Sequence, residues 1–220
     1  MSLDRSSYGA VAIVYILSAL VLALVFMATG SPVVRGIVAA LALVFCVWQT
    51  SFHIVPQRKC VLSEGEVVSV ADGRVVSVGK AFEREHLCRE CIMVSVYMDF
   101  WDKHANFWPV DGTVTYTMYH PGRHFLAFKP KASEENEHAC MSVRTGGGED
   151  VFFKLLAGGF ARRIACYGRK DDSVKAGEQC GIIKFGSRVD MYLPIDSQIL
   201  VKPGDYVRAC ATVIARLNRY

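Results

Sequence analysis

The dipeptide Gly186-Ser187 is a place where the backbone itself could react. Glycine lacks a Cβ atom, so its carbonyl group can be approached closely and its backbone can be strained at low cost. The Ser187 hydroxyl could attack this carbonyl, and the acyl group would then shift from nitrogen to oxygen. Gly-Ser is also common in ordinary turns, so the dipeptide alone does not establish this chemistry.

Several other side chains could move protons. His104 lies in Asp102-Lys-His-Ala-Asn, and His120 lies in Tyr-His-Pro-Gly. Imidazole titrates near neutral pH and suits proton delivery, and Asp102 could hold His104 in the tautomer that this needs. Asp72 lies in Ala-Asp-Gly, a sequence that is also typical of a turn. A surface histidine and a turn aspartate are the competing interpretations of His104 and Asp72.

Three arginines are candidates for binding an anionic group, namely Arg162, Arg163 and Arg123. Guanidinium groups suit both phosphate and carboxylate. Arg162 and Arg163 are adjacent, so in a helix they cannot both face one ligand. A solvated pair is the alternative.

Cysteines suggest a metal site only superficially. Cys88 and Cys91 have ligand spacing, but no second cysteine pair stands at a zinc-ribbon distance, so we expect no metal. The eight cysteines are scattered along the chain, and Cys46 lies within an apolar run. A reduced domain that faces the cytoplasm explains them more simply than disulfides do.

The charged residues divide the chain of 220 residues into two parts. Only three of the 46 charged side chains, Asp4, Arg5 and Arg35, lie in residues 1–56. This part contains two uncharged runs, 10–29 and 36–52, separated by Gly-Ser-Pro. We predict a membrane-anchoring helical hairpin with helices at about 9–29 and 33–52. A cleaved signal peptide is the alternative, but its apolar region is normally shorter.

Basic residues indicate how the hairpin is oriented. Arg5 precedes it, Arg58 and Lys59 follow it, and the turn carries only Arg35. The positive-inside rule then places both ends, and the domain that follows, on the cytoplasmic face of the inner (plasma) membrane. The net charge is +4, but the Lys and Arg residues form no dense basic stripe, which argues against nucleic acid as a partner.

Residues 57–220 have the pattern of a mostly β (α+β) domain. Short runs rich in Val, Ile, Tyr and Thr are separated by turn signals such as Asp72-Gly73 and Asp111-Gly112. One helix is predicted from Phe153 to Ala165. Two Val-Lys-x-Gly-acid segments look like those of biotinyl and lipoyl domains, which predicts a barrel-sandwich-like architecture. The exposed lysine of a carrier turn is missing, so the likeness ends there.

Ordered motifs make a more specific signal than any of these residues alone. They are Val70-Ala-Asp-Gly-Arg-Val-Val, the segment 94–114 around Asp102-Lys-His-Ala-Asn, Tyr119-His-Pro-Gly-Arg-His-Phe, Ser133-Glu-Glu-Asn-Glu, Ala161-Arg-Arg-Ile-Ala-Cys-Tyr and Phe185-Gly-Ser-Arg-Val-Asp. In this order they closely resemble the phosphatidylserine decarboxylases, in their short bacterial and archaeal branch. The resemblance runs from about residue 52 to the C-terminus.

The resemblance implies a self-processed enzyme. The family cleaves itself at the Gly-Ser bond, which here would give a β chain, 1–186, and an α chain, 187–220, that stay associated. Ser187 would become a covalent pyruvoyl cofactor. This group would form a Schiff base with phosphatidylserine in the bilayer, release CO2 and yield phosphatidylethanolamine. A homodimer is plausible for the family.

The resemblance also suggests roles for particular residues. Asp72 matches an aspartate that assists self-cleavage, and His104 matches a histidine near the pyruvoyl group. Longer relatives have a second histidine where this chain has Phe107, so the base for self-cleavage is left open between His104 and His120. Two alternatives to the function are a decarboxylase of another serine-headed lipid, such as archaetidylserine, and a non-enzymatic membrane-tethered lipoyl-like adaptor.

Overall fold

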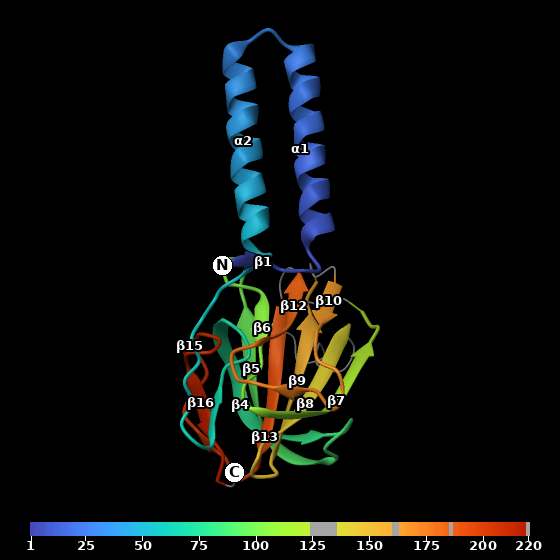
Figure 1. The fold of residues 1–220 in the computed structure, drawn as a ribbon. Helices are drawn as coiled ribbons and strands as arrows, with labels where there is room; N and C mark the ends of the chain where they lie inside the picture. Colours follow the sequence, from blue (N-terminus) through green and yellow to red (C-terminus); the bar gives the residue numbers. More distant parts are fainter. Residues whose placement is uncertain (124–135, 160–162, 185–186, 219–220) are drawn as a thin grey trace.

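The computed structural model describes residues 1–123, 136–159, 163–184 and 187–218. Two N-terminal helices project side by side from one end of a body built from antiparallel strands, here called the β body (Figure 1). The expectation of a mostly β fold preceded by a helical pair is confirmed. One predicted helix, discussed below, is wrong.

The helices are α1 (Tyr8–Ala28) and α2 (Pro32–Ser51), close to the predicted bounds. No residue of α1 is buried, and both helices are long and apolar enough to cross a membrane. Pro32 begins α2, where its missing N–H is not needed. Arg35 donates from Nε to the Thr29 carbonyl at 2.8 Å and from Nη2 to that of Phe26 at 2.6 Å, which satisfies free carbonyls at the end of α1.

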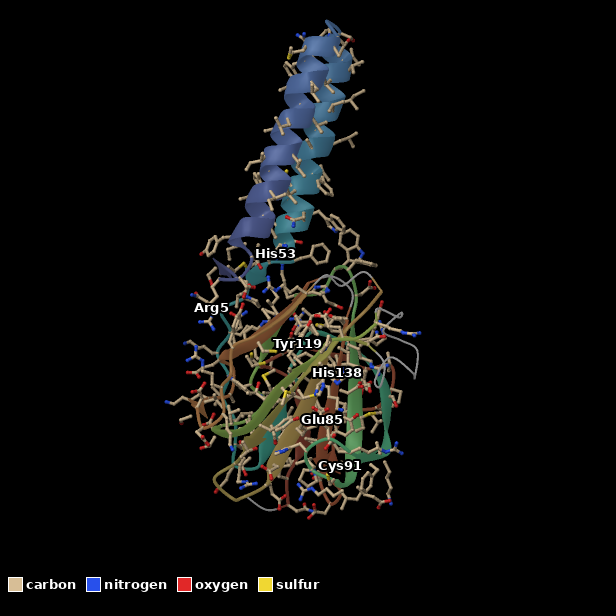
Figure 2. The ribbon with its side chains drawn as sticks, turned by 90° about the vertical axis from the view of Figure 1, so that its right-hand side faces the viewer. Arg5, His53, Glu85, Cys91, Tyr119 and His138 are labelled. Carbon is tan, nitrogen blue, oxygen red and sulfur yellow. The ribbon has the colours of Figure 1, made fainter. Side chains whose placement is uncertain are left out.

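A polar network joins the foot of the helices to the β body. Strand β1 (Ser2–Leu3) pairs with β2 (Ile54–Val55) directly beneath them. The carboxylate of buried Asp4 accepts hydrogen bonds from Tyr167 at 2.6 Å and from Gln179 at 2.9 Å. His53 lies at this junction (Figure 2), with Nδ1 2.9 Å from the Ser7 hydroxyl. The orientation of the helices is therefore fixed by side chains of the β body.

An eight-stranded sheet forms the larger layer of the β body and curls into a half-barrel. In spatial order its strands are β11 (Ser173–Val174), β7 (Gly112–His120), β8 (His138–Arg144), β9 (Asp150–Ala157), β13 (Ser187–Pro194), β5 (Arg89–Met98), β4 (Gly73–Glu83) and β15 (Tyr206–Val207). Two three-stranded sheets cover one face of it. They consist of β10 (Arg163–Cys166), β12 (Gln179–Lys184) and β6 (Ala105–Phe107), and of β14 (Gln198–Ile199), β16 (Val213–Arg216) and β3 (Glu66–Val68).

The main core lies between these layers. Met141, Leu155 and Val189 of the large sheet are fully buried against Ile183 and Ile214 of the smaller sheets. A second, smaller cluster lies on the opposite face of the large sheet, around Cys91, Cys140, Phe152 and Tyr192. The central strands therefore have buried side chains on both faces.

This double burial explains the incorrect helix prediction. The segment predicted as a helix from Phe153 to Ala165 instead contains most of β9 and the first residues of β10. Leu155 and Leu156 are both fully buried, although they point to opposite faces of the sheet. A continuous apolar run of this kind is compatible with a buried helix or a buried strand, and periodicity does not separate the two.

The two Val-Lys-x-Gly-acid segments form matching turns between strands. The backbone carbonyls of Lys175 and Lys202 each accept a hydrogen bond from the N–H of the acidic residue three positions later. The carboxylate of that acidic residue accepts one from the backbone N–H of the lysine. Gly177 and Gly204 have φ values of +84° and +99°, which favour glycine. The two similar segments therefore share a turn geometry.

Candidate active site

Ser187 is the first residue of β13, in the middle of the large sheet. It pairs with Met98 of β5 on one side and with Ala157 of β9 on the other. The side chain is fully buried, and its Oγ makes no hydrogen bond within the described ranges. Leaving a buried hydroxyl without a hydrogen bond costs stability, and Ser142 Oγ and Ser197 Oγ share this property, so the reactivity of Ser187 has to be argued from its neighbours. Gly186 lies outside the described residues.

His104 lies beside the strand that leads to Ser187. Its carbonyl accepts a hydrogen bond from the Ile183 N–H at 3.2 Å, near the end of β12. The next residues form β6, where Asn106 Nδ2 lies 3.9 Å from the sulfur of Met98. Met98 is the cross-strand partner of Ser187. Packing on both strands thus brings the His104 segment toward Ser187, which the chain order alone does not indicate.

The hydrogen bonds of His104 define how its ring can act. Nδ1 lies 2.9 Å from the backbone carbonyl of Asp102, which can only accept, so Nδ1 carries the proton in the neutral ring. Nε2 then has a lone pair, and it is buried without a hydrogen-bond partner among the described residues. Burial lowers the pKa of His104 below its ordinary value. The ring is therefore neutral at pH 7 and can accept a proton at Nε2.

Asp102 contacts His104 through its backbone, while its carboxylate has other partners. Oδ1 accepts a hydrogen bond from the Tyr206 hydroxyl at 2.5 Å, and Oδ2 accepts one from the Asp99 N–H at 2.7 Å. The carboxylate thus fixes the loop that carries the carbonyl, and the carbonyl fixes the tautomer of His104. Tyr206 was not among the residues expected from the sequence.

Asp72 is held as a buried carboxylate near the same histidine. Both of its oxygens accept hydrogen bonds from the Arg58 guanidinium, and Oδ1 also accepts one from the Ala209 N–H at 2.9 Å. Its negative charge acts on the His104 ring and favours the protonated form. In the sequence Arg58 indicated only membrane orientation, because a contact over 14 residues leaves no local pattern.

The Arg58–Asp72 pair predicts a specific stability difference. Arg58→Ala would leave the Asp72 carboxylate, with 7% of its side chain exposed, without its charged partner. We expect a loss of about 3 kcal/mol of unfolding free energy, because a buried charge stays uncompensated. In detergent this should lower the Tm by roughly 6–12 °C.

Arg144→Ala is the matched control for this measurement. Arg144 pairs with Asp150 at 2.9 Å, but 53% of its side chain is exposed. Exposed ion pairs contribute about 0–1 kcal/mol, so the Tm should hardly change. Equal effects of the two variants would contradict the structural role of Arg58.

The remaining candidates are distributed over two places. Arg163 is exposed at the start of β10, opposite Lys184 at the end of β12, and Lys184 lies three residues before Ser187 in the chain. Arg123 is exposed, and its backbone carbonyl accepts a hydrogen bond from the Glu137 N–H. The Glu137 carbonyl in turn accepts one from the N–H of Ala157, the last residue of β9. Arg162 lies outside the described residues.

His120 does not join His104. It pairs with His138 of β8, and the same cross-strand row continues to Leu156 of β9 and Arg188 of β13. Ser187 precedes Arg188, so its side chain points to the opposite face of the sheet. Three strand spacings of about 4.8 Å also separate the two strands. Of the two histidines, His104 and not His120 is therefore the one whose segment packs toward Ser187.

The comparisons with known proteins point to a single family. A family model for phosphatidylserine decarboxylase matches residues 45–215. A phosphatidylserine decarboxylase proenzyme from Parabacteroides distasonis is 40% identical over 71% of this chain and 71% of its own length. The Nitrosomonas europaea proenzyme is 41% identical over 74% and 75%, and that of Porphyromonas gingivalis is 35% identical over 86% of both chains.

These similarities define the protein as an enzyme, a decarboxylase. In particular, the chain belongs to the phosphatidylserine decarboxylase family.

Proposed function

We propose that this protein is a self-processing, pyruvoyl-dependent decarboxylase that converts phosphatidylserine to phosphatidylethanolamine and CO2. The observation that carries the proposal is that two buried atoms lack hydrogen-bond partners among the described residues and lie on segments that strand register and packing bring together. These atoms are Oγ of Ser187 and Nε2 of His104. One needs to lose a proton to become a nucleophile, and the other can accept it.

Self-cleavage would use these two residues. Ser187 Oγ attacks the carbonyl carbon of Gly186 while His104 takes its proton, and the peptide C–N bond breaks to leave an ester. Loss of the Ser187 α-proton then expels the Gly186 carboxylate and leaves a dehydroalanine. Addition of water to its imine tautomer releases ammonia and leaves a ketone. The products are a chain of residues 1–186 and a chain of residues 187–220 that begins with a pyruvoyl group.

The surroundings of Ser187 fit such a group. The position is fully buried between Met98 and Ala157, and no described hydrogen bond needs the serine hydroxyl. When formed, the pyruvoyl group supplies a carbonyl that binds the substrate amine and accepts the electron pair left by CO2. His104 would deliver a proton to the former α-carbon, while Asp72 adds negative charge nearby. Arg163 offers an exposed guanidinium for the phosphate of the lipid.

Strand pairing supports an enduring association of the two chains. Residues 187–220 would supply β13, β14, β15 and β16. Three of them pair with strands of the other chain: β13 with β5 and β9, β15 with β4, and β16 with β3, while β14 pairs with β16. A cut before β13 breaks none of these pairs, so the products should stay together without a covalent link.

The site lies beside the proposed membrane anchor. The Phe52 ring, directly after α2, is 5.1 Å from the His104 ring, and Lys103 Nζ is 3.5 Å from the Ser51 carbonyl. Trp101 in the same loop is 80% exposed, as suits a side chain at a membrane surface. We propose that the hairpin spans the inner (plasma) membrane and that the β body faces the cytoplasm, in line with the basic residues at its ends.

Intact-mass spectrometry of the purified protein, with a vesicle assay, tests the proposal. We expect two chains with the masses of residues 1–186 and of 187–220 bearing an N-terminal pyruvoyl group. Phosphatidylserine vesicles should yield phosphatidylethanolamine and CO2, and vesicles with archaetidylserine distinguish the second substrate. An uncut chain without activity would favour the adaptor alternative and contradict the proposal.

A further inference from the structure

A cluster of metal-ligand side chains lies on the face of the large sheet that is opposite Ser187. It consists of Glu85, His120, His138 and Cys140, whose ligand atoms all lie within 4.8 Å of one another. His120 and His138 are opposite each other on β7 and β8, and Cys140 is two residues along β8 on the same face. Two imidazoles, a thiol and a carboxylate are a ligand set that Zn²⁺ accepts in tetrahedral sites.

The fourth ligand arrives from a distant part of the chain. Glu85 lies between β4 and β5, and β9, β13 and β5 separate β8 from β4 in the sheet. The loop is held over this face by Glu83, which is buried and accepts backbone hydrogen bonds from Glu85, His86 and Leu87. Figure 2 shows Glu85 and His138 near each other in the middle of the β body.

Hydrogen bonds outside the cluster already orient the ligands. His138 Nδ1 lies 2.6 Å from the Asn136 carbonyl, so Nδ1 carries the proton and Nε2 presents a lone pair. Ligating histidines commonly have this backbone contact. Nε2 faces Glu85 Oε2 at 3.9 Å, and the same oxygen accepts a hydrogen bond from Cys140 Sγ at 3.1 Å, so ligand atoms of three residues converge on one point. The other oxygen, Oε1, is 2.7 Å from His120 Nε2.

The net negative charge of the cluster and its neighbours Glu83 and Lys154 also favours binding of a cation. Lys154 contacts Glu85 Oε2 at 2.9 Å and Glu83 at 3.7 Å, so one ammonium faces two carboxylates. One negative charge remains in excess. Binding of Zn²⁺, with release of the Cys140 proton to solvent, would make the group neutral. Lys154 can keep its contact with Glu85 Oε2 while the other carboxylate oxygen, Oε1, binds the metal.

We propose that Glu85, His120, His138 and Cys140 form a Zn²⁺ site that joins the β4–β5 loop to the β7–β8 hairpin. The metal ties together strands from both halves of the half-barrel, with β13 between them. Its role is structural, because the site lies on the face away from Ser187. It stands independently of the proposed decarboxylase mechanism.

Cobalt binding to the full-length protein in detergent tests the site. After treatment with a chelator, we expect the wild type to bind one Co²⁺ with a thiolate-to-cobalt absorption band, and Zn²⁺ to displace it. Cys140→Ser should lose the band and weaken metal binding at least about tenfold. Cys91→Ser is the matched control, since Cys91 is equally buried on the same face but outside the cluster.

A second ligand variant keeps the test decisive if Cys140→Ser fails to fold. His120→Gln changes a ligand whose side chain is 37% exposed, so the fold should persist, and circular dichroism can check this. It should also weaken Co²⁺ binding, and Zn²⁺ should raise the Tm of the wild type more than that of either variant. Absence of the band in the wild type, or unchanged binding in both ligand variants, would overturn the site.

Discussion

Replacing Ser187 with alanine should leave a single full-length chain without decarboxylase activity. The variant lacks the only atom of this residue that could attack the Gly186 carbonyl, and alanine cannot become a pyruvoyl group. The fold should persist, because the Ser187 hydroxyl has no hydrogen bond to lose in the described structure and the side chain loses a single atom. The expected loss is therefore chemical, with little change in stability.

Gel electrophoresis and intact-mass spectrometry measure the cleavage, and release of CO2 from phosphatidylserine vesicles measures activity. Ser142→Ala is the matched control. Ser142 is also fully buried in the large sheet, on β8, with an Oγ that has no partner among the described residues. It should be cut and active like the wild type. Cleavage of Ser187→Ala at the same bond would refute the assignment of Ser187.

His104→Ala should slow the chemistry by about 10²–10⁴-fold, the usual contribution of a positioned acid or base. The two reactions need separate measurements, namely the rate at which the precursor is cut and the turnover per cut molecule. A loss in both would mean that His104 acts twice, and a loss only in turnover would give self-cleavage another base. His86→Ala is a control, because that ring stacks on Tyr116 away from Ser187.

The pH dependence provides a second measurement for His104. Burial lowers its pKa below the ordinary value of 6.5, so the ring stays neutral, and competent as a base, at pH 6.5. As the pH falls through the lowered pKa, the ring becomes protonated and cleavage should slow. The acid limb of the cleavage rate should therefore lie below pH 6.5 in the wild type and disappear in His104→Ala. An unchanged profile in the variant would exclude His104 as the group that titrates.

The sequence alone could indicate the parts of the fold that depend on local patterns. Two uncharged runs around a Gly-Ser-Pro break predicted two helices, and the observed helix ends lie close to the predicted ones. Glycines in matching turns marked the strand connections. The segment around Leu155 was misassigned because burial on both faces removes the alternation that identifies a strand.

The candidate site was harder to predict because its contacts join distant segments. Ser187 and His104 could be named, but the approach of β6 to β12 and β5 required the fold. Arg58 and Tyr206 went unnoticed because each contacts an aspartate far away in sequence. His120 was a reasonable alternative base by residue type, yet sheet register places it on the other face.

Ser187 begins a strand whose two neighbours, β5 and β9, come from segments far apart in the chain. The surroundings that would make its hydroxyl reactive exist only once these segments have assembled, and His104 joins them through β6. The proposed cut is therefore a late event that a nascent or misassembled chain cannot perform. Because cleavage requires the folded arrangement, every cut molecule would be one that has folded. The ratio of cut to uncut chains in a cell would then measure how efficiently the precursor matures.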